Sequence, residues 1–178
     1  MSARPHKREY FMKIATVVAS RSTCMRRAVG CVLINELDQI IATGYNGRHR
    51  GAPNCNDRNS FACEGATSPT GSNLEGCEAI HAEQNALMQC ANVHDIAVCF
   101  VTTAPCVHCT KMLLNTSCRI IVYGEEYAAS GLKLWVGALA VDSNGRSIRR
   151  RAFQVTRNGL TREFEPTPFS GPFPGIVA

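Results

Sequence analysis

The sequence feature that most constrains this chain is a pair of short motifs that carry metal-ligand side chains. Residues 81–83 read His-Ala-Glu, and residues 105–109 read Pro-Cys-Val-His-Cys. Structural zinc sites use four protein ligands, whereas catalytic sites use three and keep one position for water. One histidine and two cysteines supply three ligands here, and the glutamate stays free to move protons. The motifs predict a catalytic Zn²⁺ centre with ligands His81, Cys106 and Cys109 and with Glu83 as general base.

The segment from residue 81 to residue 123 is predicted to alternate helix and strand. Helices are expected at 81–92 and 106–115, and Pro105 suits the entry to the second one. Continuous apolar runs at 96–103 and 119–123 predict buried strands. Both ligand groups then stand at helix N-termini, where the helix dipole favours the thiolate form that binds metal. Such alternation predicts a partly parallel sheet.

Segments on either side predict the rest of an α/β fold. An apolar stripe at 8–20 predicts a first helix. The apolar runs 28–34 and 40–45 flank a polar turn, which predicts a hairpin of two buried strands. A helix at 130–142, weakened by two glycines, and a last strand at 148–155 are expected to follow.

Length and composition predict one domain with a tail. A chain of 178 residues can bury a sizeable core, and we place the domain at residues 1–156. Residues 157–178 hold four prolines and three phenylalanines, which predicts an irregular tail. Residues 47–80 form a long insertion rich in Gly, Asn, Ser and Cys. A loop of this length in a compact domain is usually functional or disordered unless something holds it in place, and a cysteine-bound metal could do so.

Charge and hydropathy narrow the expected partners. No apolar run is long enough to span a membrane, and the first residues lack the apolar core of a signal peptide. We therefore expect a cytoplasmic protein, in the host cytoplasm if a phage encodes it, with no membrane partner. A net charge of +5 suits anionic substrates such as nucleotides. That charge is mild and aromatic residues are only 7%, so we expect no nucleic-acid partner.

Ten cysteines is a high count for this length. In a long chain without a secretion signal, metal ligands or buried thiols are favoured over disulfides. Two cysteines belong to the metal motif, four lie in apolar stretches and are expected to fill the core, and four remain to be explained. The core set is Cys31, Cys90, Cys99 and Cys118, and the unexplained set is Cys24, Cys55, Cys63 and Cys77.

Other interpretations of the motifs stay open at this point. Cys-x-x-Cys can be a redox pair, but that leaves the preceding proline and His-x-Glu unexplained. A catalytically silent zinc module would have no use for the carboxylate of Glu83. An enzyme that acts on a base in RNA or single-stranded DNA would need stacking aromatics and a continuous basic groove. An assay for ammonia release distinguishes between these hypotheses.

With these motifs the sequence resembles the deoxycytidylate (dCMP) deaminases of the zinc-dependent cytidine and deoxycytidylate deaminase family, and most closely the phage members. His-x-Glu followed by Pro-Cys-x-x-Cys is the signature of zinc deaminases that act on cytosine or adenine. The resemblance implies a cytidine-deaminase-like three-layer fold, a mixed five-stranded sheet flanked by helices, assembled as a homohexamer. It covers about residues 8–128 and includes Val29-Gly30, Gly44-Tyr45-Asn46-Gly47 and Tyr123 to Tyr127.

The resemblance implies hydrolysis of dCMP to dUMP and ammonia, which would supply dUMP for thymidylate synthesis. Glu83 would take a proton from a water at the fourth zinc position, deliver it to ring nitrogen N3, and protonate the amine that leaves C4. Activation by dCTP and inhibition by dTTP, bound with Mg²⁺ between subunits, are also implied. Asn92 stands where some relatives carry an arginine linked to allosteric control.

The resemblance also implies roles for residues that bind the nucleotide. Asn46 matches an asparagine that contacts the sugar, although Asn before Gly is also what a tight turn uses. Tyr127 matches a tyrosine near the substrate phosphate, and Arg26 is a candidate phosphate partner. Arginines near the 44–47 loop suit a triphosphate through bidentate contacts, or form a solvated basic face. The effector candidates are Asn46, Gly47, Arg48 and Arg50.

A second, structural zinc is the last implication of the resemblance. Cys24 and Cys55 match positions that hold this zinc in phage relatives. Cys63 and Cys77 are candidates to complete a four-cysteine site, which would contribute folding free energy. The alternative is that all four are free thiols.

Overall fold

The computed structural model describes residues 4–57, 62–69, 71–73, 75–142, 144–156 and 159–166. None of the helices in this part has the length and apolar character needed to cross a membrane. The helices are α1 (Lys7–Ala19), α2 (Ala82–Gln89), α3 (Val107–Leu114) and α4 (Ser130–Gly137), with a 3-10 turn at Val93–Asp95. The strands are β1 (Gly30–Ile34), β2 (Ile40–Tyr45), β3 (Val98–Thr103), β4 (Ile120–Glu125), β5 (Leu139–Val141), β6 (Ser147–Arg149), β7 (Arg151–Val155) and β8 (Thr161–Glu163).

Six strands form one mixed sheet in the order β2-β1-β3-β4-β7-β8. β1 pairs antiparallel with β2 and β3, whereas β3, β4 and β7 run parallel. The predicted α/β fold class, a mixed sheet flanked by helices, is confirmed. The sheet has one strand more than the five expected, because β8 lies in the segment predicted to be an irregular tail. Its backbone pairs antiparallel with β7, with Phe153 opposite Glu163.

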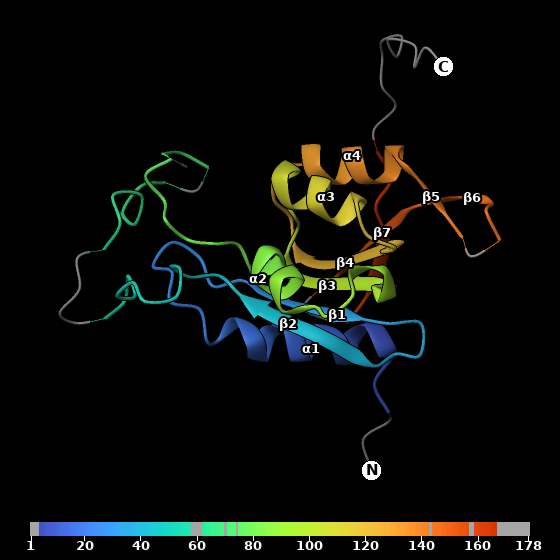
Figure 1. Ribbon diagram of the computed structural model, residues 1–178, viewed down its shortest axis with the longest axis horizontal. Helices are drawn as coiled ribbons and strands as arrows, with labels where there is room; N and C mark the ends of the chain where they lie inside the picture. Colours follow the sequence, from blue (N-terminus) through green and yellow to red (C-terminus); the bar gives the residue numbers. More distant parts are fainter. Residues whose placement is uncertain are drawn as a thin grey trace, which may run out of the picture.

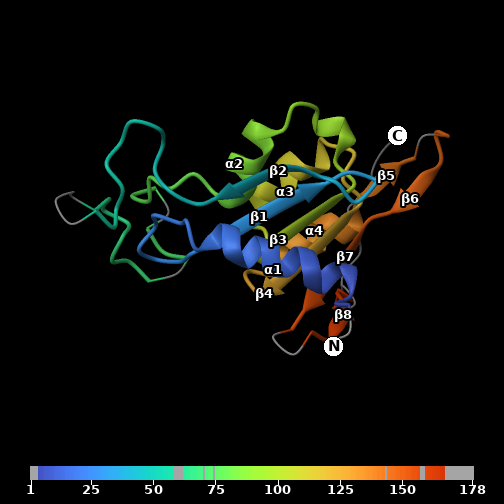
Figure 2. The same ribbon diagram turned by 90° about the horizontal axis from the view of Figure 1, so that it is seen from below.

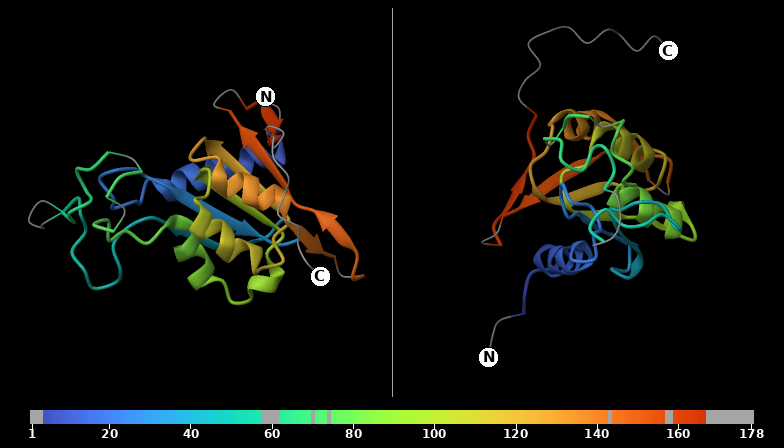
Figure 3. Two further views of the ribbon diagram at one scale, coloured as in Figure 1. Left: turned by 90° about the horizontal axis from the view of Figure 1, so that it is seen from above. Right: turned by 90° about the vertical axis from the view of Figure 1, so that its left-hand side faces the viewer.

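The sheet separates two hydrophobic cores, one on each face. α1 covers one face, where Phe11 packs with Phe100 and Val122. α2, α3 and α4 cover the opposite face (Figure 1; Figure 3). The largest side chain of this second core is Trp135, which is fully buried and donates its Nε1–H to the Arg151 carbonyl oxygen at 2.9 Å. The fold is therefore three layers deep, as the resemblance implied.

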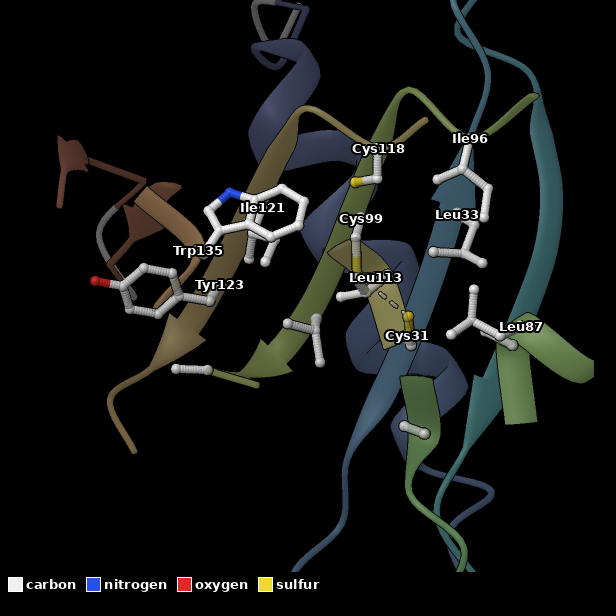
Figure 4. Close-up of a cluster of buried hydrophobic side chains, with 14 of the residues drawn as sticks. Cys31, Leu33, Leu87, Ile96, Cys99, Leu113, Cys118, Ile121, Tyr123 and Trp135 are labelled. Carbon is white, nitrogen blue, oxygen red and sulfur yellow. Dashed lines mark hydrogen bonds between the residues drawn. The ribbon is translucent and has the colours of Figure 1, made fainter. Parts of the chain in front are cut away.

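Three of the four cysteines predicted to fill the core do so. Cys31, Cys99 and Cys118 are fully buried on the helix-rich face, and the sulfurs of Cys31 and Cys99 lie 3.6 Å apart (Figure 4). Burial raises the pKa of the Cys118 thiol, so it stays neutral and packs as a small apolar side chain. Cys90 differs, because it ends α2 and is only half-buried, with its thiol donating to the Asn92 carbonyl oxygen at 3.3 Å.

Two glycines let helices lie directly on the sheet backbone. A Cβ added at Gly44 in β2 would lie 2.3 Å from the carbonyl oxygen of Ala82 in α2. A Cβ at Gly30 in β1 would lie 2.1 Å from the carbonyl oxygen of Ala15 in α1. Only a residue without a Cβ permits such an approach, so the two glycines seat α1 and α2 on opposite faces of the sheet.

Two elements predicted near the C-terminal side are divided in the structure. The helix predicted at 130–142 ends at Gly137, and β5 begins two residues later. The strand predicted at 148–155 is interrupted at Arg150, between β6 and β7. Arg150 is buried, and its guanidinium donates to the last carbonyl of α3 and to that of Cys118, so this residue turns inward instead of continuing the strand. β5 and β6 form a separate hairpin that extends from the sheet (Figure 1).

The insertion predicted at residues 47–80 extends from the end of the sheet where α2 begins (Figure 1; Figure 2). Its described part consists mainly of turns, bends and irregular backbone. The two ends of the insertion meet at a neck formed by Gly47 and Ile80. The Gly47 N–H donates to the Ile80 carbonyl at 3.2 Å, and the Ile80 N–H donates to the Gly47 carbonyl at 2.8 Å. This pairing brings the chain back to β2 directly before the first metal motif.

Candidate metal centre

The predicted ligands stand at two helix starts. His81 is the N-cap of α2 and Cys106 is the N-cap of α3, so each helix begins one residue later than expected. The Gln84 side chain accepts a hydrogen bond from the His81 backbone N–H at 2.8 Å, which fixes the entry to α2. Cys109 lies in the first turn of α3 and is fully buried. The N-terminal ends of α2 and α3 therefore fix the backbone positions of all three predicted ligands.

The geometry of these three groups fits a zinc ion. The Nδ1 atom of His81 lies 3.5 Å from the Cys106 sulfur and 3.3 Å from the Cys109 sulfur. Zinc bonds of about 2.3 Å to sulfur and about 2.0 Å to nitrogen, at tetrahedral angles, separate these atoms by about 3.5 Å. Among the described residues, this is the one group of three or more candidate ligands within 4.8 Å of one another. Thiolate with imidazole is a donor set that Zn²⁺ prefers, and the fourth corner remains for water.

The pKa values of the three ligand groups are shifted in different directions. A hydrogen bond with Cys109 and a further one with His81 lower the pKa of the Cys106 thiol to about 3. The same cysteine pairing, together with burial, raises the pKa of Cys109. The hydrogen bond with Cys106 also raises the pKa of His81. Because Zn²⁺ binds thiolate, loading the centre must release the proton of the Cys109 thiol.

Glu83 is the fourth functional side chain of the centre. It lies in the first turn of α2 and is 3% exposed. Burial raises the pKa of its carboxyl group, and this outweighs the lowering effect of His81. A buried carboxyl group with a raised pKa, placed beside these ligand groups, is suited to accept and return a proton.

A pocket with a volume of about 120 Å³ opens beside these residues. His81, Glu83 and Cys106 contribute to its wall, so the centre faces a cavity that a small ligand can enter. The segment before β1, the insertion and the residues after β4 complete the wall. The lining residues are Cys24, Arg26, Arg27, Val29, Asn46, Gly71, Cys77, Ala79, His81, Ala82, Glu83, Thr103, Ala104, Cys106 and Tyr127.

Most of this chain matches a known protein family. The cytidine and deoxycytidylate deaminase zinc-binding region matches residues 5–125. The chain belongs to this family. The deoxycytidylate deaminase of Schizosaccharomyces pombe is 40% identical over 126 residues, which are 70% of this chain and 38% of the relative. The deoxycytidylate deaminase of Mycobacterium phage D29 is 38% identical over 128 residues, 70% of this chain and 98% of the relative.

The match to the longer relatives is partial. This deaminase-family chain spans 38% of the length of the S. pombe relative and 39% of that of the Saccharomyces cerevisiae relative. Among solved structures, the dCMP deaminase of cyanophage S-TIM5 in complex with dCMP and dUMP superposes with a TM-score of 0.58 at 27% identity. That superposition covers 75% of this chain and 92% of the phage protein. The resemblance inferred from the motifs is therefore confirmed.

Asn46 lines the pocket of this deaminase-family chain, and its side chain also braces the neighbouring backbone. Its Nδ2 donates to the Arg27 carbonyl oxygen at 2.8 Å. Its Oδ1 accepts from the Val29 N–H at 2.8 Å and from the Ser22 hydroxyl at 2.7 Å. Asn46 therefore holds the segment of residues 22–29 against the end of β2. Its contact with a sugar stays a prediction.

Arg26 and Tyr127 line the same pocket, but they make different contacts. The Nη2 atom of Arg26 donates to the carbonyl oxygens of Pro69 and Ser72, at 2.6 Å and 2.9 Å. Arg26 is thus bonded to the insertion, and its predicted contact with a phosphate stays a prediction. The Tyr127 ring lies 5.5 Å from the guanidinium carbon of Arg27.

The predicted effector residues other than Asn46 lie outside the pocket wall. Gly47 forms the neck of the insertion. Arg48 donates to the Glu78 carboxylate at 2.9 Å and to the Pro53 carbonyl oxygen at 3.1 Å, so it joins two parts of the insertion. Arg50 is exposed. Their roles in binding a triphosphate stay predictions.

The four unexplained cysteines separate into two places. Cys55 and Cys63 are buried together in a small cluster within the insertion. Burial raises the pKa of Cys63, but hydrogen bonds with the Glu78 backbone and the Cys55 side chain bring it below its ordinary value. Cys24 and Cys77 line the pocket instead. The four sulfurs form no ligand group among the described residues, so the structure does not bring the predicted second zinc site together.

Arg27 also lines the pocket, and the sequence indicates it only as one of four arginines near the 44–47 loop that suit a triphosphate or form a solvated basic face. It is one of two adjacent arginines before β1, and adjacency alone gives no signal that separates their roles. Thr103 and Ala104 are also pocket residues that were not predicted. Their position at the end of a buried strand, directly before Pro105, is a signal that could have found them.

Proposed function

We propose that this chain is a zinc-dependent deaminase that hydrolyses dCMP to dUMP and ammonia. The observation that carries the proposal is the buried carboxyl group of Glu83 beside three ligand groups, in the wall of a pocket. A structural zinc site would use a fourth protein ligand and would not need this carboxyl group. The cyanophage S-TIM5 relative, solved with dCMP and dUMP, supports the choice of nucleotide.

The residues divide the chemistry between them. Zn²⁺ held by His81, Cys106 and Cys109 would supply one property, the acidification of a water molecule. Two thiolates offset the charge of the ion, so a nearby base is needed. Glu83 accepts the proton of this water and transfers it to N3 of the cytosine ring as C4 is attacked. It then takes the proton of the new C4 hydroxyl group and passes it to the exocyclic amine, so that the C4 carbonyl forms as the C4–N bond breaks and ammonia leaves.

Ammonia release by the zinc-loaded protein tests the proposal. We expect dCMP to yield dUMP and ammonia in equal amounts, with activity lost on chelation and recovered with Zn²⁺. A single-stranded oligonucleotide that contains cytosine should yield none. Turnover of the oligonucleotide but not of dCMP would support the alternative of a nucleic-acid deaminase. Turnover of neither would support a zinc module without catalytic activity.

We further propose that dCTP activates and dTTP inhibits the enzyme, each with Mg²⁺, in a homohexamer that supplies dUMP for thymidylate synthesis. The support is the resemblance of the 44–47 loop to the dCMP deaminases. Assays with each triphosphate, with and without Mg²⁺, test the regulation, and light scattering tests the assembly. Rates that do not respond to either triphosphate would contradict the first proposal, and a monomeric mass would contradict the second.

A further inference from the structure

One side chain, that of Gln84, contacts both of the helix starts that supply the predicted zinc ligands. Its Oε1 accepts a hydrogen bond from the His81 backbone N–H at 2.8 Å. Its Nε2 donates to the Met112 sulfur in α3 at 3.8 Å. Met112 lies three residues after Cys109 and so on the same face of α3. Gln84 thus reaches from the backbone of one ligand to the helix turn beside another.

His81 lies where the irregular insertion changes into a regular helix. The pairing of Ile80 with Gly47 holds the residue before it, and the His81 carbonyl oxygen accepts the N–H of Asn85 at 3.0 Å. The His81 N–H lies between these two restraints, and an N–H at a helix start has no partner within the helix. The side chain of Gln84 supplies that partner. This contact therefore completes the restraint on the backbone from which the imidazole extends.

The two contacts of Gln84 need both ends of its amide group. A backbone N–H can only donate, so the amide oxygen must face His81, and the amide nitrogen is left to face Met112. The metal centre depends on the same pair of helices. The imidazole comes from the start of α2 and both sulfurs come from the start of α3, 3.5 Å and 3.3 Å from Nδ1. A shift of one helix against the other would change both distances.

We infer that Gln84 is a positioning residue of the zinc centre, which holds the ligand-bearing starts of α2 and α3 in register and so increases the affinity for Zn²⁺. This inference rests on the zinc centre of the proposed function but not on the reaction. The next residue has a different role. Asn85 donates its Nδ2–H to the Tyr45 carbonyl oxygen at 2.7 Å, so it joins α2 to β2. Gln84 instead relates α2 to α3.

Competition for Zn²⁺ between the protein and a chromophoric chelator tests this role. Gln84→Ala should weaken zinc binding about 10- to 100-fold, as is typical when a group that orients a metal ligand is removed. Gln84→Asn keeps the amide but is one methylene too short to reach the His81 N–H, so it should behave like Gln84→Ala. Gln84→Glu keeps the reach and an acceptor oxygen. In high salt, which screens the added charge, it should bind Zn²⁺ within about fivefold of the wild type.

A methionine pair tests the link to α3. Met112→Leu keeps the apolar volume but removes the sulfur acceptor, so it should weaken zinc binding about two- to fivefold. Met88→Leu makes the same change at an exposed position of α2 and should bind Zn²⁺ as the wild type does. This pair decides the outcome even where Gln84→Ala fails to fold. Wild-type affinity in Met112→Leu would overturn the inference that Gln84 relates the two helices.

A second helix start separates positioning from general stability. The Nδ1 atom of His6 accepts the Arg8 N–H at 3.3 Å at the start of α1, so His6→Ala removes a comparable contact far from the metal centre along the chain. His6→Ala and Gln84→Ala should both lower the urea midpoint of the zinc-free protein, but His6→Ala should keep the wild-type zinc affinity. Equal zinc affinity in these two variants would overturn the inference. Zinc binding is measured without dCMP, so a Gln84-dependent zinc centre that releases no ammonia would refute only the proposed function.

Discussion

Two regions of this chain carry clustered cysteines, but within the part of the chain that the structure describes only one of them assembles a ligand group. Cys106 and Cys109 stand at the start of a helix that packs on the sheet, whereas Cys55 and Cys63 lie in an insertion of turns. A helix fixes the directions of successive side chains, so spacing along the sequence becomes spacing between atoms. An irregular loop provides no such relation. The difference teaches that a cysteine motif predicts a metal site most securely when a regular element presents it.

Removing a ligand from the helix-borne centre should have the largest effect. Cys106→Ser replaces a thiolate by a neutral hydroxyl, so zinc should be lost and ammonia release from dCMP should fall by at least about a thousandfold. Elemental analysis and the ammonia assay measure the two effects. Cys90→Ser, which changes a half-buried thiol at the end of α2, is the matched control and should retain both. Full zinc content in Cys106→Ser would contradict the role of Cys106 as a zinc ligand.

Removing the carboxyl group should separate catalysis from metal binding. Glu83→Gln cannot accept a proton, so kcat should fall roughly 10²–10⁴-fold while the zinc content stays at the wild-type value. Glu64→Gln changes an exposed carboxylate of the insertion and should leave kcat unaltered. The measurement is ammonia release at saturating dCMP, with zinc counted in the same samples. Wild-type turnover in Glu83→Gln would contradict the assigned role of this residue.

A change in the close packing of α2 against the sheet should have the third largest effect. Gly44→Ala forces a Cβ against the α2 backbone and should reduce the free energy of unfolding by about 1–3 kcal/mol. Gly137→Ala is the matched control, since no atom lies within 4 Å of the Cβ position there. It should leave stability unchanged or raise it by about 0.4–1 kcal/mol through reduced entropy of the unfolded chain. Urea unfolding of the zinc-loaded proteins compares them, and equal stabilities would contradict the close packing.

The smallest effect is expected in the insertion. Cys63→Ser should lower the free energy of unfolding by about 1 kcal/mol and leave one zinc per chain, as in the wild type. Elemental analysis of both proteins sharpens the contrast between the two regions. A wild-type value near two that falls to one in Cys63→Ser would show that the four cysteines gather a second Zn²⁺. The contrast between helix and loop would then disappear.

Local patterns allowed much of the fold to be predicted. The strands β3 and β4 can be recognised from their continuous apolar runs, because a strand buried on both faces shows no alternation with polar residues. The break at Arg150 could not be predicted, since its cause is the carbonyl groups of α3 and of Cys118, far from it in sequence. β8 was missed for the same reason. Its short polar sequence carries no strand signal, and pairing with β7 alone defines it.

The site divides in a similar way. His81, Glu83 and the two cysteines of the second motif could be predicted because zinc chemistry demands those residue types at that spacing. The different contacts of Arg26 and Arg27 could not, because they come from the insertion and from Asn46. Sequence thus predicts the residues of the His-Cys-Cys group better than the contacts made by the rest of the pocket wall.

The neck of the insertion lies one residue before the first metal ligand. Ile80 makes both backbone hydrogen bonds to Gly47, and the next residue is His81. Displacement of the loop must therefore disrupt this single rung before it can shift the imidazole. This rung joins the end of an irregular loop to the end of β2 at the point where the regular backbone of α2 takes over.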